Sequence, residues 1–259
     1  TANLAHTYTA AAGYVKKFPA VLSGTRVEDV LAELGWPASL ADIDAGQVVL
    51  AAFVPAADGT PALEHLLDIA ESEGGVIFVS GTGKVVFQDR DARLGTANGI
   101  TCTGSMIDLN AAQATFSDDG SDQKYISADP EDDDEFIYNE AKISGDAITD
   151  QIYRDLTAQA SQGPSVLVRS GSLLSVDADA LDQAWTMVER YKDSVLRVPS
   201  LLLLPDADPT NLFPKVLLYD LSTRINLELN ASPNPAMLDQ DYHIEGIEDK
   251  YEAGELWQT

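Results

Sequence analysis

The stretch with the most suggestive chemistry is Gly-Thr-Gly-Lys at residues 81–84, which contains part of a phosphate-binding loop. Such a loop needs a glycine, four further residues and then Gly-Lys-Ser/Thr, placed between a strand and a helix. Five residues before Gly83 stands Phe78, and Lys84 is followed by Val85 within a β-branched run. We therefore predict that this stretch is a hairpin turn and that it binds no nucleotide.

Other short motifs also fall short of a catalytic or metal site. Residues 121–124 have the Ser-x-x-Lys spacing of β-lactamase-like enzymes, but the companion motifs are missing. The acidic runs at 118–122 and 129–135 lack the spacing of an EF-hand loop, so we interpret them as solvated loops. The three histidines are scattered, at His6, His65 and His243.

Cys102 is the single cysteine, which excludes an intramolecular disulfide and a zinc site built from several cysteines. We predict no catalytic, cofactor-binding or metal-binding residue and no cofactor. Three tryptophans, Trp36, Trp185 and Trp257, are predicted to anchor either the core or an interface, and the sequence leaves both roles open.

The chain is strongly acidic. Its 16 lysines and arginines stand against 42 aspartates and glutamates, for a formal net charge of −26. Such a surface repels the phosphates of nucleic acids and anionic lipid headgroups. We therefore expect DNA only as passing cargo in a conduit, although adaptation to high salt is an open alternative source of the acidity. No apolar run reaches the roughly 18 residues that a membrane helix needs, so we expect no membrane insertion.

The apolar periodicity predicts the elements that would position these residues. Helices are expected over residues 25–34, 60–73 and 178–192, and Gly74 is expected to end the second of them. A hairpin is predicted over residues 76–89, and the C-terminal half is otherwise rich in strand patterns. We predict an α+β, mainly β fold.

The same patterns suggest a division into domains. Residues 25–94 are predicted to form a small α/β domain of two helices, a strand and a hairpin. Residues 1–24 would be an arm or strand from an upstream part, residues 95–125 a connector, and residues 126–259 a β-rich domain with one packed helix. Because the chain begins with Thr1, we expect that it is a trimmed or excised piece.

The order of these segments resembles the central part of the minor tail or baseplate-hub proteins of tailed bacteriophages. A Gly-Trp-Pro turn precedes Ile43, Asp44 and Gly46, which match a first motif of that family. A helix then leads into a second motif, matched by Gly75, Phe78, Gly83, Phe87, Asp89 and Arg90.

The resemblance continues through the second half. The segments at 136–146, 195–205, 217–229 and 242–259 follow the order of the family. The resemblance covers roughly residues 25 to 259 and is weak between 95 and 130. A Tyr-Gly element expected after the first strand of the hub barrel is replaced here by residues 151–165, which leaves the geometry of that turn open.

The resemblance implies a structural role without chemistry or cofactor. It implies that residues 126–259 form a hub-like β-barrel, that the chain forms a homo-oligomer with a trimer favoured, and that an upstream part supplies the missing strands of the barrel. The implied partners are tube, distal tail, tip or fibre proteins. The implied location is the tail tip of the virion, after synthesis in the host cytoplasm.

Two alternatives stay open. The first is a receptor- or carbohydrate-binding module at the tail tip, which would use exposed aromatic residues and calcium at the acidic loops. The second, which we favour least, is a cell-wall hydrolase carried on the tail. A hydrolase would need a cleft with a perturbed carboxylic acid or a metal site.

Overall fold

In a computed structural model, the chain folds into two compact units, each built from two separate stretches of sequence. Unit 1 comprises residues 1–91 and 133–195, and unit 2 comprises residues 92–132 and 196–259. The structure describes residues 17–55, 60–93, 112–120, 122–128, 130–132, 137–193, 196–229 and 238–250.

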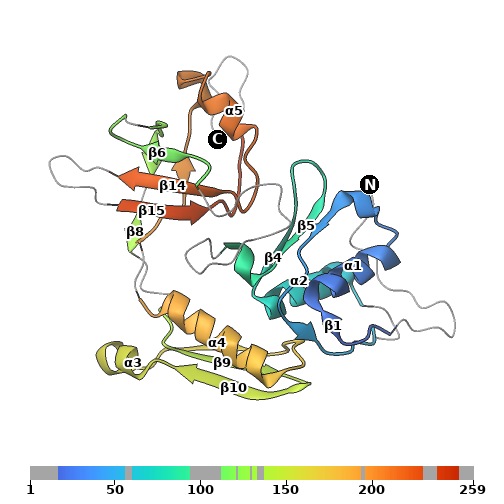
Figure 1. Ribbon diagram of the computed structural model, residues 1–259. Coiled ribbons are helices and arrows are strands. Elements are labelled where there is room, and N and C mark those ends of the chain that lie inside the picture. Colours follow the sequence, from blue (N-terminus) through green and yellow to red (C-terminus); the bar gives the residue numbers. More distant parts are fainter. Residues whose placement is uncertain are drawn as a thin grey trace. The chain divides into compact units, whose positions relative to one another are not determined.

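The first stretch of unit 1 contains two packed helices and a three-stranded sheet (Figure 1). The helices are α1 (Ser23–Glu33) and α2 (Ala62–Glu73). The sheet has the order β2-β5-β4, in which β2 runs parallel to β5 and β4 runs antiparallel to it. The strands are β1 (Val21–Leu22), β2 (Ala41–Ile43), β3 (Val49–Leu50), β4 (Val76–Val79) and β5 (Val85–Gln88), with β1 paired to β3.

The predicted turn at residues 81–84 is confirmed. It joins β4 to β5, and the backbone N–H of Ser80 donates to the carbonyl of Lys84 at 2.8 Å. Gly83 has a φ of 81°, a left-handed conformation that glycine adopts without strain. A short 3-10 helix, η2 (Arg90–Arg93), follows β5, so the loop does not open an α-helix that would face a phosphate.

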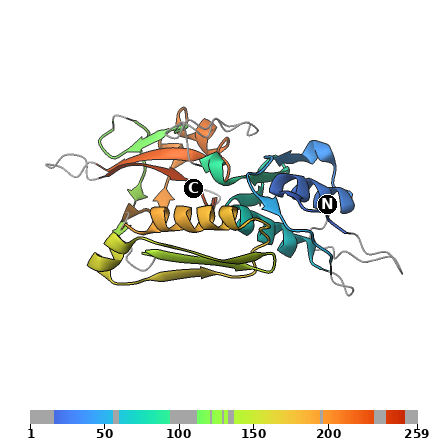
Figure 2. The same ribbon diagram turned by 60° about the horizontal axis from the view of Figure 1, so that its bottom comes forward.

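The second stretch of unit 1 is a three-stranded sheet covered on one face by a helix. In chain order its elements are β9 (Glu140–Gly145), β10 (Ile148–Arg154), α3 (Leu156–Gln162), β11 (Val166–Arg169) and α4 (Asp177–Tyr191). β9 is central, with β10 antiparallel on one side and β11 parallel on the other. α4 runs along this sheet in both ribbon views (Figure 2).

α3 was not predicted, and it occupies the segment that replaces the Tyr-Gly element of the family. Its N-cap is Asp155, whose carboxylate accepts hydrogen bonds from the backbone N–H groups of Thr157 and Ala158. α3 connects β10 to β11, which lets β11 lie parallel to β9.

One hydrophobic core joins the two stretches of unit 1. Val27 of α1, Leu66 of α2 and Phe87 of β5 belong to the same buried cluster as Ile143 of β9 and Val188 of α4. Each of these side chains is at most 1% exposed. The helices and hairpin of the first stretch are therefore completed by residues that follow about fifty positions later in the chain.

Unit 2 has a separate core, which contains Phe116, Leu212 and Leu227. Its main sheet has the order β15-β14-β6, and two short pairs, β13-β7 and β12-β8, accompany it. The elements of unit 2 are β6 (Thr115–Ser117), β7 (Ser127–Ala128), β8 (Glu131–Asp132), β12 (Leu196–Arg197), β13 (Leu201–Leu202), α5 (Leu212–Val216), β14 (Arg224–Leu229) and β15 (Leu238–His243). Short 3-10 helices lie at Pro205–Ala207 in unit 2 and at Ala38–Leu40 in unit 1.

These elements confirm the predicted α+β class and place the three expected helices within two residues of their predicted ends. The expected barrel over residues 126–259 is not seen as a closed barrel in the described residues, where every sheet has two or three strands. β9 pairs with β10 and β11 and contributes Ala141 and Ile143 to the core of unit 1, whereas β14 belongs to a separate sheet of unit 2.

The contacts also group the chain differently from the domain ranges expected at 1–24, 25–94, 95–125 and 126–259, because residues 133–195 pack with the first stretch. Those ranges stay predictions.

Among the described helices, none is both long enough and apolar enough to cross a bilayer.

Candidate functional site

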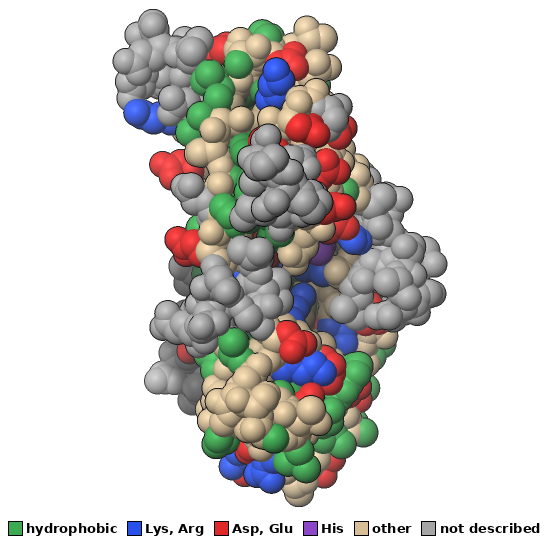
Figure 3. Space-filling view, turned by 90° about the vertical axis from the view of Figure 1, so that its left-hand side faces the viewer, with side chains coloured by type: hydrophobic (Ala, Val, Ile, Leu, Met, Phe, Trp, Pro, Cys, Tyr) green, Lys and Arg blue, Asp and Glu red, His purple; other side chains and the backbone are tan. Residues whose placement is uncertain are grey.

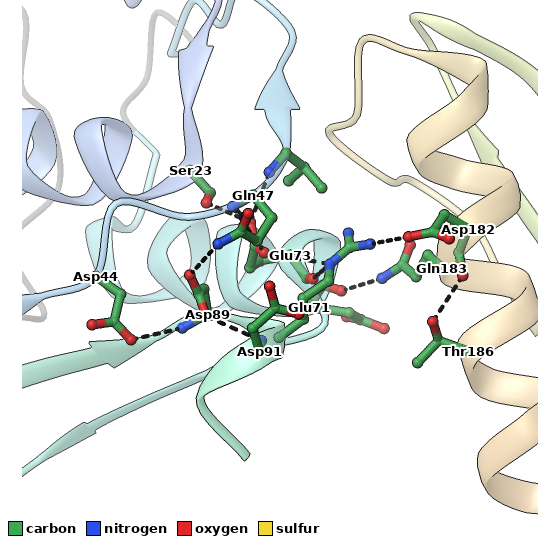
Figure 4. A network of polar contacts seen from close by, with 12 residues as sticks. Ser23, Asp44, Gln47, Glu71, Glu73, Asp89, Asp91, Asp182, Gln183 and Thr186 are labelled. Atoms are coloured by element: carbon green, nitrogen blue, oxygen red, sulfur yellow. Dashed lines mark hydrogen bonds and ion pairs between the residues drawn. The ribbon is translucent and has the colours of Figure 1, made fainter. Parts of the chain in front are cut away.

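A buried carboxylate, that of Glu73 at the end of α2, is the centre of a polar network (Figure 4). The Ser23 hydroxyl donates to it at 2.5 Å, and the backbone N–H groups of Gln47 and Val48 donate at 3.2 and 3.3 Å. The Nε of Arg90 lies 3.5 Å from its Oε1. A carboxylate that is 0% exposed is tolerated only with such partners, because an unpaired buried charge costs several kcal/mol.

Arg90 ties the end of α2 to α4. Its Nε donates to the Glu73 carbonyl at 3.0 Å, and its Nη1 donates to the Asp182 carboxylate at 3.1 Å. Beside it, the Gln183 side chain donates to the Glu71 carbonyl at 2.8 Å. Since the Asp182 side chain is 63% exposed, its ion pair adds little stability, and the hydrogen bond of the buried Gln183 is the stronger polar link between α2 and α4.

Two further carboxylates, those of Asp44 and Asp89, continue the network. The backbone N–H of Asp89 donates to Asp44 at 3.2 Å, while Asp89 accepts from the Gln47 side chain at 2.9 Å and from the Asp91 backbone at 3.0 Å. Burial raises the pKa of Asp44 to about 6, and the nearby acidic side chains add to this effect. The Asp44 carboxylate is directed at a backbone N–H group, as expected of a structural residue (Figure 4).

Two glycines allow the segments around Glu73 to approach each other closely. A Cβ atom on Gly46 would lie 1.8 Å from the Ser23 hydroxyl oxygen, and a Cβ on Gly75 would lie 2.2 Å from the Gln88 carbonyl oxygen. Gly46 also has a φ of 81°. Five of the residues that carry the sequence resemblance, Asp44, Gly46, Gly75, Asp89 and Arg90, thus lie in or beside this polar network.

Two cavities of unit 1 are small or shallow. One cavity of about 40 Å³ has room for a few water molecules, and its lining includes Asp68, Ser72, Arg169 and Gln183. A wide groove of about 630 Å³ lies beside the turn between β9 and β10 and is lined by residues 146–149 and 175–177. Within the described ranges, no group of three or more His, Cys, Asp or Glu side chains is arranged to hold a metal ion.

The predicted anchors lie in different surroundings. Trp36 packs against the core of unit 1, and its Nε1 donates to the Leu40 carbonyl at 2.8 Å. Trp185 is 47% exposed on α4, beside Leu181, which is 42% exposed. Trp257 lies outside the described residues, as do Cys102 and His6.

His65, Arg26 and Glu73 are three buried polar residues to which the sequence assigned no structural role. The His65 ring stacks on Phe53 with 4.1 Å between centroids, and Arg26 donates to the carbonyls of Pro19 and Ala51. Arg26 and Glu73 both stand on the apolar stripe of their helix, four residues from Val30 and Ile69, respectively. A charged residue in such a stripe was the signal that could have identified them.

Comparison with solved structures identifies the fold. The tail protein from Neisseria meningitidis MC58 matches 89% of this chain with a TM-score of 0.54 and 13% sequence identity. The 43 kDa tail protein of prophage MuSo2 from Shewanella oneidensis matches 97% of this chain with a TM-score of 0.57 and 12% identity. The chain has the fold of a phage tail protein.

The predicted resemblance to tail proteins is therefore confirmed for the fold. The tail-protein match spans only 62% of the Neisseria chain and 65% of the Shewanella chain. No protein-family model matches the sequence, and no curated protein sequence matches it either. The relation to phage tail proteins is thus visible in the structure and in the order of short motifs.

This tail-protein fold exposes apolar side chains on both units. In Figure 3, hydrophobic side chains lie among acidic and basic ones at the lower end of the view, where Figure 1 places α3, β9 and β10. The exposed apolar residues include Ile152, Leu156, Val166, Val168, Leu181 and Trp185 in unit 1, and Leu217 and Leu218 in unit 2. Exposed apolar side chains that gather in one area can contact another protein, whereas single ones are ordinary on a protein surface.

Proposed function

We propose that this chain is a structural component of a bacteriophage virion tail and that it works through protein–protein contacts. The observation that carries the proposal is the shared fold, which extends over 89% and 97% of this chain in two tail proteins. The collinear motif series adds support, because its Arg90 contacts the buried Glu73, and its Gly46 and Gly75 allow the close approach of the segments around Glu73.

In finer terms, we propose a minor tail or baseplate-hub subunit at the tail tip, assembled as a homo-oligomer, with a trimer favoured, around the tail channel. Sheets of both units end in strands that the described residues leave without a further neighbour, namely β10 and β11 in unit 1 and β15 in unit 2. Such edges can accept a strand from another chain. Tube, distal tail, tip or fibre proteins would supply these strands and complete a barrel-like wall.

The net charge of −26 suits a channel through which DNA passes without adhering, since the wall and the phosphates repel each other. The role we propose involves no catalysis. It is supported by the Glu73 carboxylate, whose burial, three hydrogen-bond donors and ion pair with Arg90 serve packing rather than contact with a substrate.

The test of this proposal is to locate the chain on phage particles. Antibodies raised against the purified chain and marked with gold should label the tail end that is distant from the head. Label on the capsid, or a complete lack of label on disrupted and intact particles, would overturn the structural assignment. Release of soluble fragments from peptidoglycan by the purified chain would overturn the non-catalytic part.

A further inference from the structure

The sheet β10-β9-β11 of unit 1 has one face that α4 does not cover, here called the outward face. Alternation along the strands directs Ala141 and Ile143 of β9 into the core, so their neighbours Glu140 and Lys142 point to the other side. The strand register then forms two rows across the outward face: Arg154, Glu140 and Val166 in one row, and Ile152, Lys142 and Val168 in the next.

The outward face exposes β-branched apolar side chains at neighbouring positions. Ile152 of β10 is 41% exposed, while Val166 and Val168 of β11 are 46% and 60% exposed. Single exposed aliphatic residues are ordinary on a protein surface. Here three of them stand in two adjacent rows of a rigid sheet, which is the arrangement of a small docking surface.

The charges on the outward face cancel. The Lys142 Nζ lies 2.5 Å from the Asp150 carboxylate, and the Arg154 Nε lies 2.7 Å from the Glu140 carboxylate. Two cations and two anions leave this face neutral, although the chain as a whole carries 16 basic residues against 42 acidic ones. The outward face is therefore a neutral, partly apolar area on a strongly acidic protein.

We propose that the outward face binds a second copy of this chain. A basic partner would be attracted to the acidic surface, whereas a second copy carries the same net charge of −26 and is repelled by it. The contact between two such chains is most favourable where each is neutral, since the centres of interfaces are depleted in unpaired charge. This inference rests on the proposed function and deepens it by assigning one surface to the assembly of identical subunits.

The proposal predicts a characteristic response to salt. Repulsion between the acidic surfaces acts over about 10 Å at 0.1 M salt and over shorter distances as salt increases. The apolar contact itself is not weakened by sodium chloride. Association of the chain with itself should therefore become tighter as sodium chloride is added, whereas a contact between an acidic and a basic surface would become weaker.

The experiment compares two substitutions that add the same charge in different sheets. Val168→Glu places a carboxylate on the outward face, and Val79→Glu places one on β4, where the valine is 49% exposed. The mass of each protein is measured by light scattering over a dilution series at low and high sodium chloride. We expect wild type to form a multimer, Val168→Glu to weaken its association by about tenfold or more, and Val79→Glu to leave it unchanged.

Circular dichroism checks that both variants are folded. Hydrogen–deuterium exchange of wild type provides a second, independent measurement. The backbone amides of residues 148–154 and 166–169 should exchange more slowly in the concentrated sample than in the dilute one. A wild type that stays monomeric at every concentration and salt level would overturn the proposal, and so would equal weakening by both substitutions.

Gold labelling of phage particles is independent of these outcomes. A monomeric chain that is found on tails would refute only the outward-face contact. A multimer that is absent from particles would refute only the tail assignment.

Discussion

Arg90 contacts Glu73 at two points, with its Nε 3.0 Å from the backbone carbonyl and 3.5 Å from the side-chain carboxylate. The Glu73 side chain is fully buried, and that of Arg90 is 12% exposed. The guanidinium thus both balances the buried charge and fixes the end of α2.

Replacement of Glu73 should be among the most destabilising substitutions in the chain. Glu73→Ala leaves Ser23, two backbone N–H groups and the Arg90 guanidinium without their shared buried acceptor. We expect the free energy of unfolding in urea to fall by about 3–5 kcal/mol. The control is Glu71→Ala in the same helical turn, where the side chain is 58% exposed and its loss should cost less than about 1 kcal/mol. Equal losses would show that the buried network contributes nothing.

Two glycines with the same positive φ angle should respond differently to alanine. Gly46 and Gly83 both have a φ of 81°, so either substitution introduces backbone strain of about 1 kcal/mol. At Gly83 the added methyl group meets nothing within 4 Å, whereas at Gly46 it would lie 1.8 Å from the Ser23 hydroxyl. We expect Gly46→Ala to lower the thermal midpoint clearly more than Gly83→Ala. A smaller or equal effect at Gly46 would contradict the close approach around Glu73.

His65 should make unit 1 sensitive to acid. Burial, with a further contribution from Arg26, lowers the pKa of His65 from 6.5 to about 4. Since the unfolded chain binds the proton more readily, the stability contribution is complete above pH 6.5 and is lost as the pH falls towards 4. His65→Phe retains a ring beside Phe53 and removes the titration. When the pH is lowered from 7 to 4.5, the free energy of unfolding in urea should fall by roughly 2 kcal/mol more for wild type than for the variant. Identical decreases would refute the lowered pKa of His65.

Asp44 should have the opposite dependence. Its pKa is raised from 3.8 to about 6, so the folded state binds the proton more readily and stability falls as the pH rises through this window. Asp44→Asn still offers an oxygen to the Asp89 backbone N–H but carries no charge. We expect the variant to be more stable than wild type at pH 7 by roughly 1 kcal/mol, after allowance for solvent screening. This advantage should vanish below about pH 4, and an advantage that persists there would contradict the assignment.

Local sequence patterns were sufficient for the elements whose formation depends on local chemistry. The glycine at position 74 ends α2 in a left-handed conformation, with a φ of 75°, and the glycine at position 83 shapes the β4–β5 turn. The apolar stripe of residues 25–34 predicted α1, although the helix begins two residues earlier, at Ser23.

Long-range relations were harder to predict. Glu73 receives hydrogen bonds from residues 25 and more positions away, and no periodic pattern encodes such partners. The packing of β9 and α4 with the first stretch of unit 1 has the same origin, because strand patterns do not state which sheet a strand joins. The motif series indicated a family and no contact, and the structure shows that its Arg90 is a partner of Glu73.

The division of the chain into two interleaved units has a consequence for biosynthesis. The polypeptide passes from one unit to the other after Asp91, after Asp132 and after Val195. While the ribosome is still translating, the core around Val27, Leu66 and Phe87 must wait for Ile143 and Val188 to emerge. The nascent first stretch therefore exposes an unfinished apolar surface during this interval, until the residues up to Val188 have been translated.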